Sequence, residues 1–352
     1  MNQVKQNGKR IPYIDALKGL AILCVVLGHV ANGQLMDPFT QTAYFFVYNI
    51  IHTFHMVLFV LLSGEVFYHA YCKETSKGGQ KGRIGIQIAR LSILYFLWSL
   101  ILGIFRMVFA EAVNTPASWS DILLIPVKPI KLYWYLFVLV IFYLFFGIFR
   151  LARANIWIVL SVTFLLSIGS YFLPYGLYFD LKRVLCYAFF FFAGIVLARM
   201  KEKVLSLKAQ KILLMVLLFF IVLSIVLCVV FWTPARFLND RFLVNWIIAI
   251  SFSLGFYVLF QKVRWLGESK LLSYLGKHSL EIYLMHTFIL SAVRYLLMKN
   301  GISAPVIHLI MGLLCGVLIP LLISFVLRKI RLYNVFFDQL KLFTNRKKIE
   351  KQ

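Results

Sequence analysis

The chain has 352 residues, of which 62% are hydrophobic and 14% are charged, and its mean hydropathy is +0.86. Because a soluble globular protein is about 45–50% apolar and about 25% charged, this composition excludes a water-soluble globular fold. An excess of 37 Lys and Arg over 13 Asp and Glu residues gives a net charge of +24; in a membrane protein it reflects basic cytoplasmic loops, whereas in a soluble one it would suggest nucleic-acid binding.

Apolar segments of about 20 residues, the length that crosses a bilayer as a helix, follow one another along the chain. We predict ten of them, separated by stretches with Pro, Gly or charge: 11–31, 45–69, 85–110, 132–150, 154–174, 183–200, 211–231, 243–261, 278–298 and 304–327. The first follows basic residues, as a signal peptide does, but it has no Ala-x-Ala cleavage site, so we expect it to be retained. The sequence therefore predicts an all-α polytopic membrane protein with one domain over residues 1–352, including a short N-terminal segment (1–10) and a basic C-terminal tail (328–352).

The distribution of basic residues predicts the orientation of these helices. With the N-terminus inside, the inner segments contain 26 Lys and Arg residues and the outer connections contain 7. The other four lie within the predicted helices: Lys18, Arg90, Arg106 and Arg294. Because basic residues favour the cytoplasmic side, we expect both termini to be cytoplasmic.

The first predicted helix carries three ionisable side chains on one face. Lys18 and His29 are 11 residues apart in the sequence, close to three helical turns, so they point the same way about 16 Å apart along the axis. Asp15 is three residues before Lys18 and shares its face. Ionisable groups inside a bilayer are candidates for function, and we expect this face to line a protein interior or a wet cavity. The structural alternative makes Lys18 an interfacial anchor and Asp15 a favourable charge at the helix N-terminus.

The second predicted helix carries ionisable residues at matching depths. His52 and His55 lie in its outer half, at a depth near that of His29, and Glu65 lies at a depth near that of Lys18. We therefore expect one cluster of His29 with His52 or His55. We expect a second cluster, which consists of Lys18 with Glu65 or with Asp15, the acidic residue of its own helix.

The ninth predicted helix adds His278, Glu281 and His286 in or beside the membrane. We interpret His278, and His69 at the end of the second helix, as structural residues of the membrane interface. No metal site is predicted, because the paired histidines of the second helix lack a carboxylate partner at ligand spacing. The five cysteines show neither metal-ligand spacing nor a disulfide framework.

Five short strings stand in order along about 270 residues of the chain. They are D-A-L-K-G-L-A-I-L-C-V-V-L-G-H (15–29), F-H-M-V-L-F-V-L-L-S-G (54–64), Y-W-Y-L (133–136), F-F-F-A-G (190–194) and L-G-K-H-S-L-E-I-Y-L-M-H (275–286). Together they resemble the motifs of the acyltransferase 3 family, especially the branch related to fucose 4-O-acetylase, and the ten-helix count fits. Lys18 replaces the Arg of many relatives, Val57 stands where the family favours Pro, and no hydrolase-like domain follows the last predicted helix.

The resemblance implies transfer of an acyl group, commonly acetyl from cytoplasmic acetyl-CoA, to a hydroxyl of a cell-surface polysaccharide or its lipid-linked sugar precursor. It implies a multi-pass protein of the bacterial cytoplasmic membrane. We expect His29 to remove the hydroxyl proton or to accept the acyl group transiently. Lys18 would hold a phosphate or the pantetheine arm, and Asp15 or Glu65 would orient Lys18. Four further residues would position the substrate or the acyl donor: His52, His55, Tyr283 and His286. The expected partners are then the acyl-CoA donor, the glycan acceptor and lipids, with no nucleic acid and no metal.

Two other classes of function fit an apolar chain with polar residues in its helices. In a transporter or flippase, the intramembrane Lys, Glu and His would bind substrate or protons, but neither paired broken helices nor an inverted repeat is visible in the sequence. In a membrane sensor or scaffold, the dense polar face of the first helix would have no use. A soluble-type lipid acyltransferase is disfavoured because no His is followed by Asp after four intervening residues, and a Gly-x-Ser-x-Gly motif is absent from the sequence.

Overall fold

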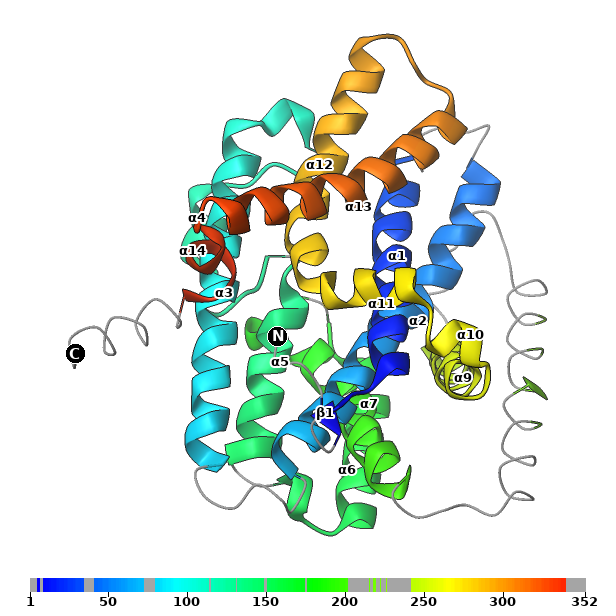
Figure 1. Cartoon of the computed structure of the whole chain (residues 1–352). Helices are drawn as coiled ribbons and strands as arrows, with labels where there is room; N and C mark the ends of the chain where they lie inside the picture. Colours follow the sequence, from blue (N-terminus) through cyan, green and yellow to red (C-terminus); the bar gives the residue numbers. More distant parts are fainter. Residues whose placement is uncertain are drawn as a thin grey trace. The chain divides into compact units, whose positions relative to one another are not determined.

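The structure is a computed structural model, shown in Figure 1, in which the chain forms two compact units. It describes the following residues: 5–6, 9–34, 41–72, 80–113, 115–130, 132–148, 151–174, 176–201, 215, 218–219, 222, 226 and 242–339. Unit 1 consists of Met1–Ala70 and Ala193–Leu318, and unit 2 consists of Tyr71–Phe192 and Ile319–Gln352. Helices dominate the described residues, which confirms the all-α class. The strands among these residues are β1 (Lys5–Gln6) and β2 (Lys9–Arg10), a short antiparallel pair.

Unit 1 is built on its first helix. Its helices are α1 (Pro12–Gln34), α2 (Gln41–Phe67), the end of α7 (Leu181–Lys201), α9 (Phe242–Lys262), α10 (Arg264–Gly267), α11 (Lys270–Lys277), α12 (Ser279–Lys299) and the first part of α13 (Pro305–Lys329). The π-helical turn η1 (Tyr68–Cys72) continues α2. A proline suits the first position of a helix because it has no N–H to leave unsatisfied, and α1 begins in this way at Pro12. Helix α1 then packs against α2, α9, α11 and α12.

The helix that follows α9 turns sharply and lies across α1. Asn245–Lys262 and Arg264–Lys277 meet at an angle of 98°. Helix α11 crosses α1 and contacts it (Figure 1). The contact is backbone to backbone: a Cβ atom at Gly276 would collide with the carbonyl of Asp15, and one at Gly19 would collide with the carbonyl of Leu272. Glycine is therefore required at both positions for α1 and α11 to approach so closely.

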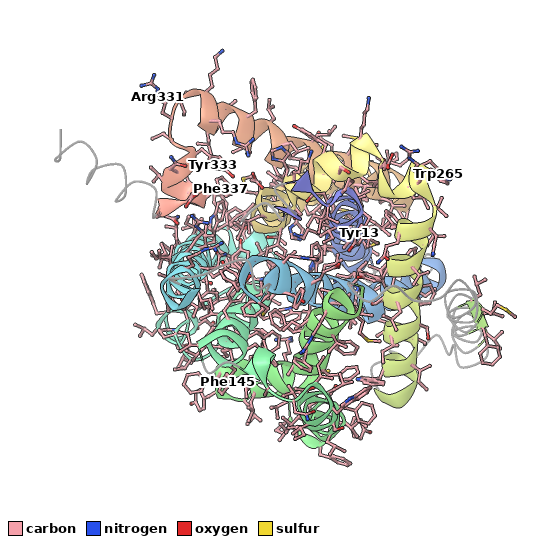
Figure 2. All side chains as sticks on the ribbon, turned by 60° about the horizontal axis from the view of Figure 1, so that its bottom comes forward. Tyr13, Phe145, Trp265, Arg331, Tyr333 and Phe337 are labelled. Carbon is pink, nitrogen blue, oxygen red and sulfur yellow. The ribbon has the colours of Figure 1, made fainter. Side chains whose placement is uncertain are left out.

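Unit 2 contains one long helix and several short ones. Its elements are α3 (Gln80–Val108), η2 (Ala110–Ala112), α4 (Trp119–Leu123), α5 (Trp134–Phe142), η3 (Tyr143–Ile148), η4 (Leu151–Arg153), α6 (Ile156–Gly169), η5 (Ser170–Phe172), η6 (Tyr178–Asp180), the first part of α7 (Leu181–Lys201), the end of α13 and α14 (Tyr333–Phe337). Its core is aromatic: the ring of Phe191 lies 5.0 Å from that of Phe142 and 5.3 Å from that of Phe146. On α14, Tyr333 stacks on Phe337 with ring centroids 4.9 Å apart (Figure 2).

The apolar helices confirm a multi-pass membrane protein. Among the described residues, six helices are long and apolar enough to span a bilayer: Pro12–Ala31, Ile50–Cys72, Gly82–Val108, Tyr178–Met200, Ser279–Lys299 and Pro305–Lys329. The bent pair of α9 with α10 and α11 would make a seventh. Two shorter apolar helices, Trp134–Ile148 and Ile156–Phe172, fall within the predicted spans 132–150 and 154–174. The predicted span 211–231 lies almost wholly outside the described residues, so the total of ten and the cytoplasmic termini stay predictions.

Candidate functional site

Buried and half-buried ionisable side chains of unit 1 gather in two groups on its helices. The first, which we call the histidine cluster, consists of His29, His52, His55 and His286. The second, which we call the glutamate cluster, consists of Tyr13, Glu65, His69 and Tyr257. Helices α1 and α2 contribute to both clusters, α12 contributes to the first and α9 to the second. The close packing of α1 against α2 therefore builds both.

The histidine cluster has His29 at its centre. The ring centroid of His29 lies 5.9 Å from that of His52 and 5.1 Å from that of His286. The rings of His52 and His55 are 5.0 Å apart. Gly28 permits this approach, because a Cβ atom there would collide with the ring of His52. The structure thus places His52 beside His29, with His55 next to His52, and adds His286 from α12.

Backbone carbonyls determine which ring nitrogen carries the proton in three of these histidines. The carbonyl oxygens of Tyr48 and Ile51 accept from Nδ1 of His52 at 2.9 Å and of His55 at 2.5 Å. Nδ1 of His286 donates to carbonyls of the preceding helical turn at 2.9 and 3.0 Å. A carbonyl can only accept a hydrogen bond, so each Nδ1 carries its hydrogen and, in the neutral ring, Nε2 is an acceptor. These are the acceptors that could receive a proton from a substrate hydroxyl.

The side chain of His286 is buried, but one of its ring nitrogens is left without a hydrogen-bond partner among the described residues. Its relative exposure is 1%, and its Nε2 has no hydrogen-bond partner among the described residues. Buried polar atoms are hydrogen-bonded in the large majority of cases. Tyr283 lies one turn earlier on α12, with its ring 6.3 Å from that of His286, so the structure brings both predicted positioning residues of this helix to the cluster.

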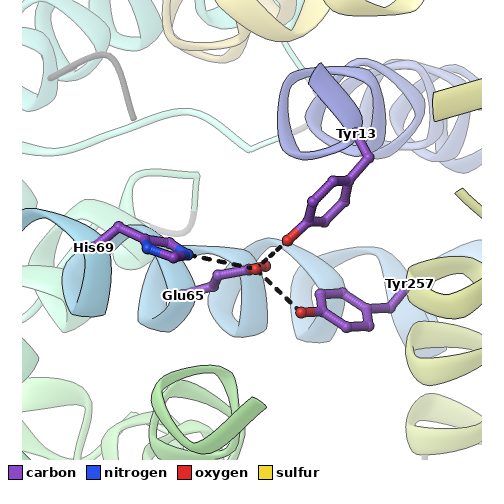
Figure 3. A network of polar contacts seen from close by, with 4 residues as sticks. All are labelled: Tyr13, Glu65, His69 and Tyr257. Carbon is purple, nitrogen blue, oxygen red and sulfur yellow. Dashed lines mark hydrogen bonds and ion pairs between the residues drawn. The ribbon is translucent and has the colours of Figure 1, made fainter. Parts of the chain in front are cut away.

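The glutamate cluster is centred on a fully buried carboxylate (Figure 3). The Tyr13 hydroxyl donates to Oε1 of Glu65, and the Tyr257 hydroxyl donates to the same oxygen at 3.1 Å. Nε2 of His69 lies 3.9 Å from Oε1. Two atoms have no hydrogen-bond partner among the described residues, Oε2 of Glu65 and Nδ1 of His69. The cluster therefore presents buried polar atoms that the protein itself does not satisfy there.

Lys18 lies close to this carboxylate. Its relative exposure is 5%, and both Asp15 and Glu65 attract its ammonium group electrostatically. Asp15 itself is half-buried on α1. Both candidate acidic partners of Lys18 thus lie within electrostatic range of its ammonium group.

Sequence reasoning did not select Tyr13 and Tyr257, and it interpreted His69 as a structural residue of the interface. A tyrosine near the end of an apolar helix is typical of a membrane interface, so the sequence around these two tyrosines did not indicate a carboxylate partner. The one available signal was the spacing of His69 four residues after Glu65, which places both on one face of α2. By contrast, His278 pairs locally with Glu281 at 3.3 Å. Within the described part of the chain, no group of three or more His, Cys, Asp or Glu residues is arranged to hold a metal ion.

The chain matches a known protein family. The model of a family described as an acyltransferase domain, acyltransferase 3, matches residues 11–329, which is nearly the whole chain and includes all the residues of both clusters. No curated protein and no solved structure matches the chain.

Proposed function

The chain belongs to the acyltransferase 3 family, and from this premise we propose that it is a membrane O-acyltransferase with acetyl-CoA as its donor. The acceptor in this proposal is a hydroxyl of a cell-surface polysaccharide or of its lipid-linked sugar precursor. The protein would lie in a bacterial cytoplasmic membrane with both termini inside. The 26 basic residues of the predicted inner segments would then attract the anionic CoA by long-range electrostatics.

The observation that carries the proposal is the position of His29 between the rings of His52 and His286. A sugar hydroxyl is a weak nucleophile and needs a positioned base, most often histidine. In the proposed step, His29 takes the hydroxyl proton while the oxygen attacks the thioester carbonyl. The carbon–sulfur bond breaks, the acetyl group stays on the sugar oxygen, and the CoA thiolate recovers the proton.

In this proposal, Lys18 and its acidic neighbours form the binding site for the acyl donor. The buried ammonium group of Lys18 would bind a phosphate or a carbonyl of the CoA donor, and Asp15 and Glu65 would orient it through the attraction described above. His52, His55, Tyr283 and His286 would position the acceptor or the acyl group beside His29. Lys18 and His29 share one helix, so α1 would connect the donor side with the reacting centre.

The test is a pair of histidine variants assayed in cells. His29→Ala should lower the base-labile acetyl ester of surface glycans by about 10²–10⁴-fold at equal protein in the membrane, the usual contribution of a general base. His308→Ala is the matched control, because His308 is also buried in unit 1 but its Nε2 donates to the carbonyl of Ile302 at 2.7 Å, away from the cluster. Full acetylation with His29→Ala would overturn the base assignment, and glycans without such an ester in wild-type cells would overturn the acetyltransferase.

A further inference from the structure

The glutamate cluster contains two unsatisfied polar atoms that the proposed chemistry at His29 does not use. Oε2 of Glu65 and Nδ1 of His69 are buried and have no hydrogen-bond partner among the described residues. Glu65 has no exposed surface, and an unsatisfied buried polar atom costs free energy comparable to its desolvation. A purely structural network would be expected to satisfy both atoms, so the cluster indicates a ligand.

The geometry of the cluster restricts the chemistry of this ligand. Tyr13 and Tyr257 both donate to Oε1 of Glu65, which leaves Oε2 as an acceptor that needs a donor. The ammonium group of Lys18, which Glu65 attracts electrostatically, carries three donors and no acceptor, so it can donate to a carbonyl of a ligand. A secondary amide supplies both in one planar group, a C=O for Lys18 and an N–H for Oε2 of Glu65 or Nδ1 of His69.

We infer that the glutamate cluster binds a secondary amide of the pantetheine arm of the acyl donor. This inference rests on the proposed function, because it assumes that acyl-CoA enters at this end of α1 and α2. Pantetheine contains two secondary amides between the nucleotide and the thioester. The acetamido group of an N-acetylated sugar has the same chemistry and is the competing source.

The position of the cluster along α2 agrees with an arm that passes it before reaching the histidines. Glu65 is ten residues after His55 on the same helix, which corresponds to about 15 Å along the axis. Lys18 and His29 have nearly the same separation on α1. An extended arm held by its amide at Glu65 would thus place its thioester toward the histidine cluster, and the two clusters would be successive sites for one donor molecule.

The inference is tested by binding, which needs neither an acceptor nor turnover. The full-length protein in lipid nanodiscs is titrated calorimetrically with CoA and with 3′-phosphoadenosine 5′-diphosphate, the part of CoA without the arm. Wild type should bind CoA at least about tenfold more tightly than the nucleotide, the effect of one hydrogen bond to a charged group. Glu65→Gln keeps the shape and an oxygen for the two tyrosines but replaces the acceptor Oε2 by a donor, and it should remove most of this difference between CoA and the nucleotide.

Two further variants make the result specific. His69→Ala should also reduce the difference between CoA and the nucleotide, and it carries the test if Glu65→Gln does not reach the membrane. Glu281→Gln is the matched control, since Glu281 is also a buried glutamate paired with a histidine three residues away; it should leave the difference intact. A difference that survives both Glu65→Gln and His69→Ala would overturn the inference while leaving the proposed function standing.

Competition distinguishes the two sources of the amide. Free pantetheine should compete with CoA in wild type and lose this effect in Glu65→Gln, whereas N-acetylglucosamine and glucose should compete equally poorly. Competition by N-acetylglucosamine alone, dependent on Glu65, would assign the cluster to the acceptor sugar and overturn the pantetheine assignment. Failure of wild type to bind either CoA or the nucleotide would overturn both this inference and the CoA donor of the proposed function.

Discussion

The two units of the molecule use buried polar side chains in different ways. In unit 2, polar groups connect short segments to the long helix α3: Arg90 pairs with Asp338 at 3.0 Å, and the Tyr95 hydroxyl donates to the carbonyl of Ile125 at 2.6 Å. The Ser118 hydroxyl and backbone N–H donate to Asp121 at the start of α4 and hold the pKa of this exposed carboxyl below its usual value. Each of these contacts attaches one piece of backbone to another.

In unit 1, polar side chains instead converge on one another from different helices. Four imidazoles meet in the histidine cluster, and a carboxylate meets two phenols in the glutamate cluster. Both clusters retain buried atoms, such as Nε2 of His286 and Oε2 of Glu65, without a hydrogen-bond partner in the described part of the chain. Unsatisfied buried atoms also occur in unit 2, for example Oγ of Ser99 and Oε1 of Gln339, so they do not distinguish the units. The difference is that ionisable side chains from several helices converge in unit 1, whereas those of unit 2 join one segment to another, and this indicates that unit 1 is arranged for chemistry.

The largest loss of stability that we predict follows substitution of a glycine in unit 1, for which a glycine of unit 2 serves as the control. Gly276→Ala places a methyl group against the carbonyl of Asp15, a backbone atom that cannot rotate away, so α1 and α11 must move apart. We expect a loss of about 3 kcal/mol of stability, at the upper end for overpacking, and reduced acyl transfer because α1 carries Lys18. Thermal unfolding in detergent measures the first, and the glycan ester measures the second.

Gly85→Ala is the matched control in unit 2. Gly85 lies within α3, and a Cβ atom there would have no neighbour within 4 Å. Alanine is favoured over glycine inside a helix by about 0.5–1 kcal/mol, so this variant should unfold at a slightly higher temperature. Equal stability of the two variants would show that the contact of α1 with α11 is not as close as the structure has it.

The second prediction concerns His286, whose Nε2 lies unpartnered beside His29 in the described structure. His286→Ala should lower glycan acetylation about 30-fold, equivalent to about 2 kcal/mol, with little change in thermal stability. If the histidine cluster acts as one unit, the double variant with His29→Ala should be no less active than His29→Ala alone, because effects within a unit are not additive. Multiplicative losses would instead show that the two histidines act independently.

Much of the fold follows from hydropathy, and its departures have physical causes. Long apolar runs predicted α1, α2, α3, α12 and α13, because a bilayer requires a minimum helix length. The segment between the predicted spans 243–261 and 278–298 is not among the predicted helices, yet it forms α10 and α11 and turns by 98° onto α1. Its apolar residues follow a helical period with charged ones between them, so an average over a window hides the helix. Only the tertiary contact of Gly276 with α1 determines where that helix lies.

The sequence predicted the depth of the site residues along the helix axes, but it did not predict the rotation of the helices about those axes. Depth along α1 and α2 follows from the rise per residue, and this brought His29 and His52 into one expected cluster. The rotation and position of α9 and α12 depend on packing, which one sequence does not reveal. For this reason Tyr257 was missed, and His286 was expected to position a substrate without being placed beside His29.

The smallest effect that we predict belongs to the ion pair of unit 2. Arg90 lies within α3, and Asp338 follows α14; their side chains are 14% and 11% exposed. Arg90→Ala should cost about 1.5 kcal/mol of stability, the lower value for a hydrogen bond to a charged group, and Asp338→Ala a similar amount. The double variant should cost less than the sum of the two, because the second substitution removes a charge whose ion-pair partner the first has already removed. Acetylation per folded molecule should stay at the wild-type level in all three variants. A large loss of acetylation without a loss of stability would end the contrast between the units, since it would give a polar pair of unit 2 a role in the chemistry.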